Sequence, residues 1–109
     1  MTTALIVNLE KLLDGPRDGA LLRYSLGNEW LKCGEPGKAA ECFRAAVERD
    51  ANYSAAWKLL GKALAESGDT AAALAAYTQG IAVAQARGDV QAAKEMSVFA
   101  RRLSASGPA

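Results

Sequence analysis

The feature that most constrains this sequence is an internal repeat of 34 residues. When the 109-residue sequence is shifted by 34 positions, six residues fall on residues of matching size or type. These pairs are Leu26 and Leu60, Gly27 and Gly61, Gly34 and Gly68, Ala39 and Ala73, Phe43 and Tyr77, and Ala46 and Gly80. Self-similarity at a fixed period of roughly 20 to 50 residues is typical of stacked copies of one structural unit. The sequence therefore predicts duplicated structure.

Each copy has the pattern of two helices joined by a turn. In the first copy, apolar residues recur at helical spacing over residues 18–33 and again over a stretch that ends near Asp50, with Gly34 and Pro36 between them. Proline is favoured in the first turn of a helix, where its missing N–H would have no partner in any case. The second copy repeats this plan. The candidate N-cap residues of the later helices are Asn52, Ser54 and Asp69.

Gly27 and Gly61 occupy the same place in the two copies, in the middle of an expected helix. Glycine there costs about 0.5–1 kcal/mol relative to alanine, so something must offset this cost twice. Close approach of two helices would do so, because a side chain at this position would hold the helices apart. We expect small residues to face the glycines, with the aromatic residues further along. The facing residues are Ala39 and Ala46 for Gly27, and Ala73 and Gly80 for Gly61, followed by Phe43 and Tyr77.

Together these residues resemble the tetratricopeptide repeat (TPR), a helix–turn–helix unit of 34 residues. The second copy, 54–87, has the signature residues Trp57, Leu60, Gly61, Ala73 and Tyr77, but Leu64 and Gln85 replace the usual Tyr and Pro. The first copy, 20–53, has Leu26, Gly27, Ala39, Phe43 and Ala46, with Arg23, Trp30 and Ala51 replacing Trp, Tyr and Pro. The resemblance implies an all-α fold, an alpha–alpha superhelix built from two helical hairpins.

The segments outside the repeats, 1–19 and 88–104, are each too short for a further repeat. We expect both to form capping helices of a single domain, because the ends of a solenoid need a polar outer face. The expected N-terminal stripe is Leu5, Leu9, Leu12 and Leu13, and the expected C-terminal stripe, after Asp89, is Ala92, Met96, Phe99, Ala100 and Leu103. The leucine-rich N-terminal helix also allows a self-association or partner-docking surface. Residues 105–109 are expected to be a disordered tail.

The composition offers no catalytic or metal-binding constellation. The sequence has no histidine, and no serine or cysteine lies in a pattern with another activating group. The segment 14–19 lacks the alternating acidic ligands and the closing glutamate of a calcium loop. Cys33 and Cys42 are too few for a disulfide scaffold, so we expect free thiols, with a redox role as the alternative. We therefore expect a protein that is not an enzyme and needs no cofactor.

Charge and hydropathy restrict the kinds of partner. Thirteen basic and twelve acidic residues give a net charge of +1, whereas nucleic-acid binders usually carry a clear basic excess. RNA binding through the helical repeats is therefore disfavoured. No stretch approaches the ~20 apolar residues of a membrane span, and no basic residue precedes the short apolar run near the N-terminus, as a secretory signal requires. We expect a cytoplasmic protein, either a monomer or a weak homodimer.

The resemblance implies a binding surface as well. Repeats of this family bind extended peptides or helices in a concave groove lined by the first helix of each repeat. Lys58 and Lys62 are four residues apart, so they share a helix face and could receive an acidic side chain or a chain terminus; alternatively, Lys62 pairs with Glu66. The family's chaperone-tail clamp is disfavoured, because Tyr24 and Leu59 stand where it needs Lys and Asn. The implied groove positions are Leu21, Tyr24, Asn28, Leu31, Ala55, Lys58, Lys62 and Ala65.

Overall fold

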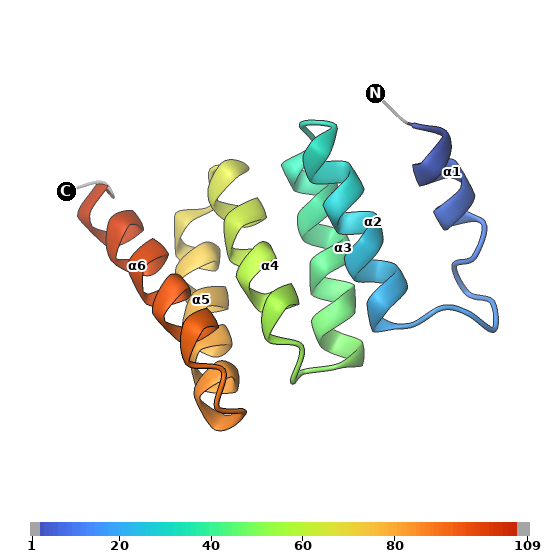
Figure 1. Ribbon diagram of the computed structural model, residues 1–109. Coiled ribbons are helices and arrows are strands. Elements are labelled where there is room, and N and C mark those ends of the chain that lie inside the picture. The colour runs from blue at the N-terminus through green and yellow to red at the C-terminus, as the bar shows by residue number, and fades with distance from the viewer. Residues whose placement is uncertain (1–2, 107–109) are drawn as a thin grey trace.

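The computed structural model describes residues 3–106, which form six α-helices and no strand (Figure 1). The helices are α1 (Ala4–Glu10), α2 (Ala20–Lys32), α3 (Pro36–Arg49), α4 (Ser54–Glu66), α5 (Thr70–Ala86) and α6 (Val90–Ser106). The helices α2, α4 and α6 lie in one layer, and α3 and α5 form a second layer behind them (Figure 1). The expected all-α superhelix is confirmed: α2 pairs with α3 and α4 pairs with α5.

The turns inside the hairpins follow from glycine and proline. Gly34 and Gly68 have φ angles of 74° and 92°, a left-handed conformation that costs glycine little and that ends α2 and α4. Pro36 is the first residue of α3, where it needs no N–H donor. The repeated glycine therefore sets the same turn in both hairpins.

Only one of the three expected N-caps is found. Asp69 is confirmed as the N-cap of α5, since its Oδ1 accepts a hydrogen bond from the N–H of Ala72 at 3.1 Å. The N-cap of α4 is Tyr53, which makes no side-chain capping bond, so the expectation for Asn52 and Ser54 is wrong. Ser54 is already inside the first turn of α4, where its hydroxyl cannot take the capping position.

Gly27 and Gly61 are buried in α2 and α4, and each lies against an aromatic ring. A Cβ added to Gly27 would lie 2.6 Å from Cε1 of Phe43, and one added to Gly61 would lie 2.6 Å from Cδ1 of Tyr77. Carbon atoms in good contact are about 3.5–4.0 Å apart, so neither position has room for a side chain. The expectation that small residues face these glycines is thus wrong, because the rings themselves occupy the space.

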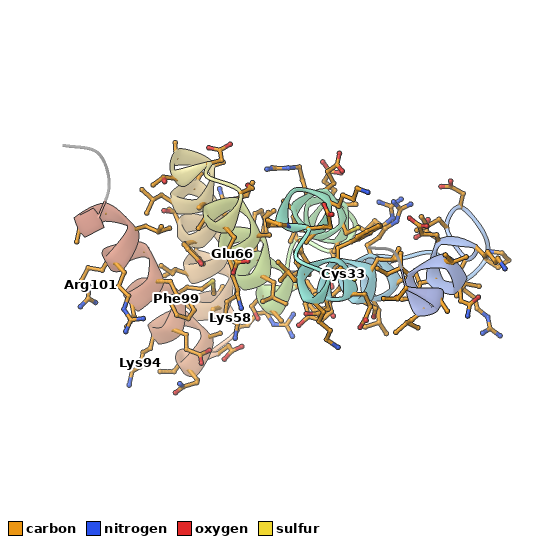
Figure 2. All side chains as sticks on the ribbon, turned by 90° about the horizontal axis from the view of Figure 1, so that it is seen from above. Cys33, Lys58, Glu66, Lys94, Phe99 and Arg101 are labelled. Carbon is orange, nitrogen blue, oxygen red and sulfur yellow. The ribbon has the colours of Figure 1, made fainter. Side chains whose placement is uncertain are left out.

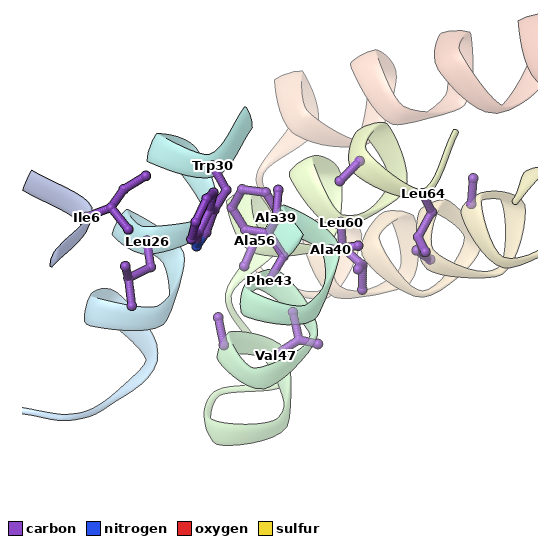
Figure 3. Packing of buried hydrophobic residues seen from close by; sticks show 14 residues of the cluster. Ile6, Leu26, Trp30, Ala39, Ala40, Phe43, Val47, Ala56, Leu60 and Leu64 are labelled. Atoms are coloured by element: carbon purple, nitrogen blue, oxygen red, sulfur yellow. The ribbon is translucent and has the colours of Figure 1, made fainter. Parts of the chain in front are cut away.

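The main cluster of buried residues runs from α1 through both hairpins (Figure 3), and a second cluster, which includes Tyr77 and Met96, joins α5 to α6. Phe43 is fully buried, and Leu26 and Leu60, which are equivalent in the two copies, are each 1% exposed. At the two ends, Ile6 of α1 and Met96 of α6 are also fully buried. Apolar burial of this kind stabilises the fold by about 1.5–3 kcal/mol for each large side chain.

The helix α1 is shorter than expected and buries a different residue. It ends at Glu10 and is followed by turns, so Leu12 does not continue its helical face. Ile6 is fully buried, whereas Leu5 and Leu12 are 49% and 37% exposed. Leu9 and Leu13 pack partly against the core. The predicted stripe is therefore confirmed for Leu9 and Leu13 and wrong for Leu5 and Leu12, because it assumed one helix as far as residue 13.

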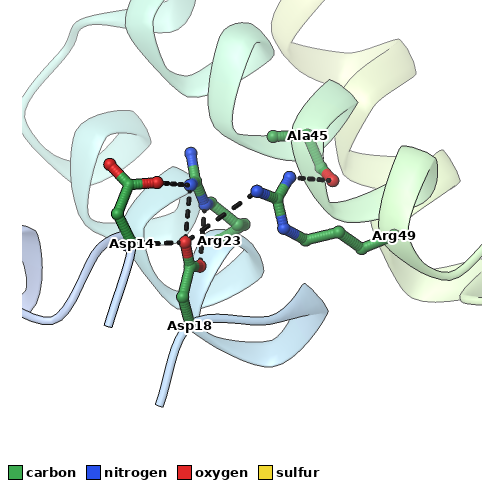
Figure 4. Close-up of polar contacts among 5 residues, drawn as sticks. All are labelled: Asp14, Asp18, Arg23, Ala45 and Arg49. Carbon is green, nitrogen blue, oxygen red and sulfur yellow. Dashed lines mark hydrogen bonds and ion pairs between the residues drawn. The ribbon is translucent and has the colours of Figure 1, made fainter. Parts of the chain in front are cut away.

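An ion-pair cluster fixes the connection between α1 and α2 (Figure 4). Arg23 donates through Nε and Nη2 to the two carboxylate oxygens of Asp18 at 3.0 and 2.7 Å, and the N–H of Asp14 donates to the same carboxylate at 2.8 Å. Arg49 of α3 approaches Asp18 to 3.8 Å. The hydrogen bond from Arg23 is the main reason why the pKa of Asp18 lies well below its usual range.

The last two helices differ from the repeat pattern in length. The helix α5 has 17 residues, whereas α3 has 14. The last helix begins directly after Asp89, as expected, and Asp89 accepts a hydrogen bond from the N–H of Ala92 at 3.2 Å that caps α6. This helix continues through Ser106, so residues 105 and 106 are helical and the expected start of the tail at 105 is wrong. Residues 107–109 of that tail lie outside the described residues.

Candidate protein-binding groove

The first-helix layer is hollowed between α4 and α6. We call this hollow the α4–α6 groove. Its main part has a volume of about 390 Å³, and an adjoining part has about 230 Å³. The residues that line the main part are Lys58, Leu59, Lys62, Tyr77 and Phe99. Figure 2 shows Lys58 and Phe99 together on this side of the molecule.

The floor of the α4–α6 groove is aromatic. Tyr77 reaches it from α5, and its ring lies 5.9 Å from the ring of Phe99 on α6 at an angle of 44°. Tilted ring pairs at this separation are favourable. Burial raises the pKa of Tyr77 to about 12, so its hydroxyl stays protonated at neutral pH. The floor therefore offers apolar and aromatic surface, and the carboxylate of Glu66 lines the adjoining part of the groove.

The two lysines at the rim of the groove have different surroundings. Lys58 Nζ lies 3.1 Å from Glu95 Oε1, an ion pair that joins α4 to α6 and in which both side chains are partly exposed. Lys62 is exposed and forms no ion pair within residues 3–106. The alternative pairing of Lys62 with Glu66 is thus not formed in this structure. Lys62 is left as an accessible positive charge beside the aromatic floor, and Arg102 also lines the adjoining part of the groove.

The other expected groove positions do not gather at this hollow, apart from Ala65, which lines its adjoining part. Tyr24 packs its ring between those of Phe43, at 5.8 Å, and Tyr53, at 4.9 Å. Asn28 is half-buried on α2. The remaining positions are Leu21, which is 69% exposed, Leu31, which packs against the core, and Ala55, which lines a separate hollow beside Arg87.

Three residues that shape the α4–α6 groove are absent from the groove positions expected from the sequence. Phe99 and Tyr77 form its floor, although both were assigned only to buried helix faces. Glu95 neutralises Lys58, and no sequence spacing relates these two residues, which lie 37 positions apart. The apolar pattern of α6 was the available signal, since Phe99 follows Met96 by three residues on the same helix.

Both cysteines are free and half-buried, as expected. Burial raises the pKa of Cys42 to about 11, which leaves little reactive thiolate at neutral pH. Within residues 3–106, no group of three or more Cys, Asp or Glu side chains is placed to hold a metal ion.

Comparison with known proteins places these features in a family. No family model matches the sequence. A TPR repeat-containing protein of Pseudomonas aeruginosa, however, is 50% identical over 99 residues, which cover 91% of this chain and 94% of that protein.

The chain belongs to the tetratricopeptide repeat family.

Solved structures agree with this assignment. The solution structure of a protein from Bordetella parapertussis is 43% identical, covers 94% of this chain and 90% of its own, and superposes with a TM-score of 0.79. A TPR domain protein from Salinibacter ruber is 28% identical, with 88% and 96% coverage and a TM-score of 0.77. TPR proteins generally serve as non-catalytic modules for protein–protein interaction. None of the helices within residues 3–106 has the length and apolar character needed to cross a membrane.

Proposed function

We propose that this TPR domain binds an acidic segment of a partner protein in the α4–α6 groove. The observation that carries the proposal is Lys62, which is exposed, has no ion pair among the described residues and lies beside the floor of Tyr77 and Phe99. A lysine at the edge of an apolar surface favours a carboxylate flanked by apolar side chains. The groove is small, so we expect affinity in the micromolar range, as for other small interfaces. The proposal includes a cytoplasmic location and no catalytic step.

The ion pair between Lys58 and Glu95 reduces the availability of Lys58 to an acidic ligand. A bound carboxylate competes with Glu95 for Lys58, because the pair is only partly buried and is worth ~0–1 kcal/mol. Lys58→Glu would place two carboxylates side by side between α4 and α6. A loss of peptide binding in this variant could then not be separated from a loss of folding stability. Lys62→Glu is the cleaner variant, since it breaks no ion pair within the part of the chain that the structure describes.

The test is selection from a random 12-residue peptide library, followed by measurement of Kd by fluorescence anisotropy. We expect the selected peptides to be rich in Asp and Glu next to apolar residues. Lys62→Glu should weaken their binding at least tenfold, and Glu95→Gln should strengthen it several-fold by freeing Lys58. Lys11→Glu, which makes the same charge change at an exposed position beyond the end of α1, is the matched control. Selection of neutral peptides, or equal losses in Lys62→Glu and Lys11→Glu, would overturn the proposal.

Self-association through the N-terminal helix is the second candidate. The observation in its favour is a set of exposed aliphatic residues around α1: Leu5, Val7 and Leu12 are 49%, 42% and 37% exposed. Sedimentation velocity over a hundredfold concentration range tests this candidate. A weak homodimer should show a rising sedimentation coefficient that Leu5→Lys abolishes, and a monomer at every concentration would eliminate it.

A further inference from the structure

The helix α6 takes the position that the first helix of a third hairpin would have, after α2 and α4 in the same layer. Its residue Met96 is fully buried, as are the equivalent residues Leu26 of α2 and Leu60 of α4, which are each 1% exposed. Met96 Sδ would lie 2.5 Å from a Cβ added to Gly80, so α6 packs closely on α5. The spacing from Leu60 to Met96 is 36 residues instead of 34, because α5 is longer than α3.

This register places Ser97 where α2 and α4 have their buried glycines. Gly27 directly follows Leu26, Gly61 directly follows Leu60, and Ser97 directly follows Met96. In each hairpin the glycine receives an aromatic ring from the next helix, as Gly27 does from Phe43. No described helix follows α6, so the equivalent face around Ser97 is uncovered within residues 3–106.

A hollow of about 630 Å³ lies on this uncovered face. We call it the α6 hollow, and its lining residues are Gln85, Val90, Ala93, Lys94, Ser97, Val98 and Arg101. Ser97 leaves the space open because its Oγ donates to the carbonyl oxygen of Ala93 at 2.9 Å, back along its own helix. Val90 and Val98 are 61% and 38% exposed, so the hollow has an apolar border.

The border of the α6 hollow is also positively charged. Lys94 and Arg101 are both exposed, and Figure 2 shows them projecting from α6 on the side away from α4. Neither forms an ion pair within the described part of the chain. No acidic side chain lines the hollow. A helix that covers this face is therefore favoured when it carries acidic residues.

We propose that the α6 hollow docks an amphipathic helix of a partner protein, with an aromatic side chain seated against Ser97 and acidic residues facing Lys94 and Arg101. The aromatic side chain is inferred from the two hairpins, in which Phe43 and Tyr77 fill the equivalent position. A second copy of this chain does not meet the requirement, because all seven of its aromatic side chains are at least half-buried in its own fold.

A peptide of the α5 sequence serves as the probe, because α5 is the helix that seats Tyr77 against Gly61. The probe comprises residues 70–86 with Gln79→Glu and Gln85→Glu, and its Kd is measured by fluorescence anisotropy at low salt. We expect at least tenfold weaker binding when the peptide also carries Tyr77→Ala. We expect a similar loss when Gln79 and Gln85 are both replaced by Lys.

Variants of the protein locate the site. Ser97→Phe should fill the hollow and weaken binding of the probe at least tenfold, with an unchanged melting temperature as the folding control. Lys94→Gln with Arg101→Gln should remove the preference for the acidic peptide over the lysine peptide, and both residues are exposed, so this double variant should fold normally. Lys62→Glu should leave probe binding unchanged, which separates this inference from the proposed α4–α6 groove.

Several results would overturn the proposal. Probe binding that Ser97→Phe does not weaken, or a charge preference that survives in the Lys94→Gln and Arg101→Gln double variant, would exclude this face. Amide chemical-shift changes centred on Gly61 would show that the probe displaces α5 instead. Concentration-dependent assembly that Ser97→Phe abolishes would assign the hollow to a second copy and exclude a partner helix as its occupant.

Discussion

The same steric pairing of a glycine with an aromatic ring occurs in both hairpins. Gly27 receives Phe43 and Gly61 receives Tyr77, at distances that leave no room for a Cβ. The ring of Tyr77 is held in turn by Phe99, so it cannot move away freely. The helix-propensity cost of each glycine is therefore offset by the burial of a complete aromatic side chain.

Gly61→Ala should therefore destabilise the protein, although alanine is the better helix former. We expect a loss of about 1–3 kcal/mol in the free energy of unfolding, as for other overpacked core positions. Gly37→Ala is the matched control: Gly37 lies in the first turn of α3 with no atom within 4 Å of an added Cβ, so this change should cause no loss of stability. Urea unfolding measures both variants. Equal effects of the two changes would show that the ring of Tyr77 yields to the added methyl group.

At the level of the helices, the 34-residue repeat predicts the turns that both hairpins share. It does not predict the segment after α1, which occurs once. Gly34 and Gly68 mark the ends of α2 and α4 because a glycine turn is encoded locally. The connection that follows α1 is not encoded in this way: it is fixed by the contact between Arg23 and Asp18, which the apolar spacing does not reveal. Arg23 departs from the family's tryptophan, and its hydrogen bonds to Asp18 give this departure a structural role.

The binding surface could also be predicted from the sequence only in part. Lys58 and Lys62 share a face of α4 because they are four residues apart, and the sequence alone establishes this. The partner of Lys58 depends on the register of α6, which the extra residues of α5 shift by two positions. Glu95, Phe99 and Ser97 could therefore be assigned to the surface only from the packed structure.

The connection between α1 and α2 makes stability depend on pH. The folded pKa of Asp18 is depressed by Arg23, whereas the unfolded value is about 3.9. The stabilisation by this pair is thus fully present above roughly pH 4 and is lost as the pH falls toward the folded pKa. Asp18→Asn should lower the free energy of unfolding at pH 7, and the gap from the parent protein should narrow between pH 5 and pH 2.

Urea unfolding at each pH checks this expectation. Glu48→Gln removes an exposed carboxylate of α3 that has no ion pair within residues 3–106, and it should cause little change at any pH. A constant gap for Asp18→Asn over the whole range would mean that the charge of Asp18 does not contribute to folding.

Across the whole molecule, packing runs from neighbour to neighbour along the superhelix. The helix α1 packs on α2, and the central helix α4 packs on α3, α5 and α6. In such linear arrays the stability of each unit comes from its own helices and its nearest neighbours. The two ends therefore open more easily than the centre, and the open face of α6 is available without unfolding of the hairpins.

Hydrogen exchange should reveal this gradient. We expect amides of α1 to exchange fastest among the helices, since Ile6 is its one fully buried residue, and amides of α4 to exchange slowest. Ile6→Ala removes a contact worth about 2–5 kcal/mol and should speed exchange in α1 while α4 keeps its protection. Leu5→Ala, at an exposed position of the same helix, should change neither rate. Equal acceleration of exchange in all helices by Ile6→Ala would show instead that the protein opens only as a single cooperative unit. In that case the stability lost at α1 would lower the free energy of opening for every helix.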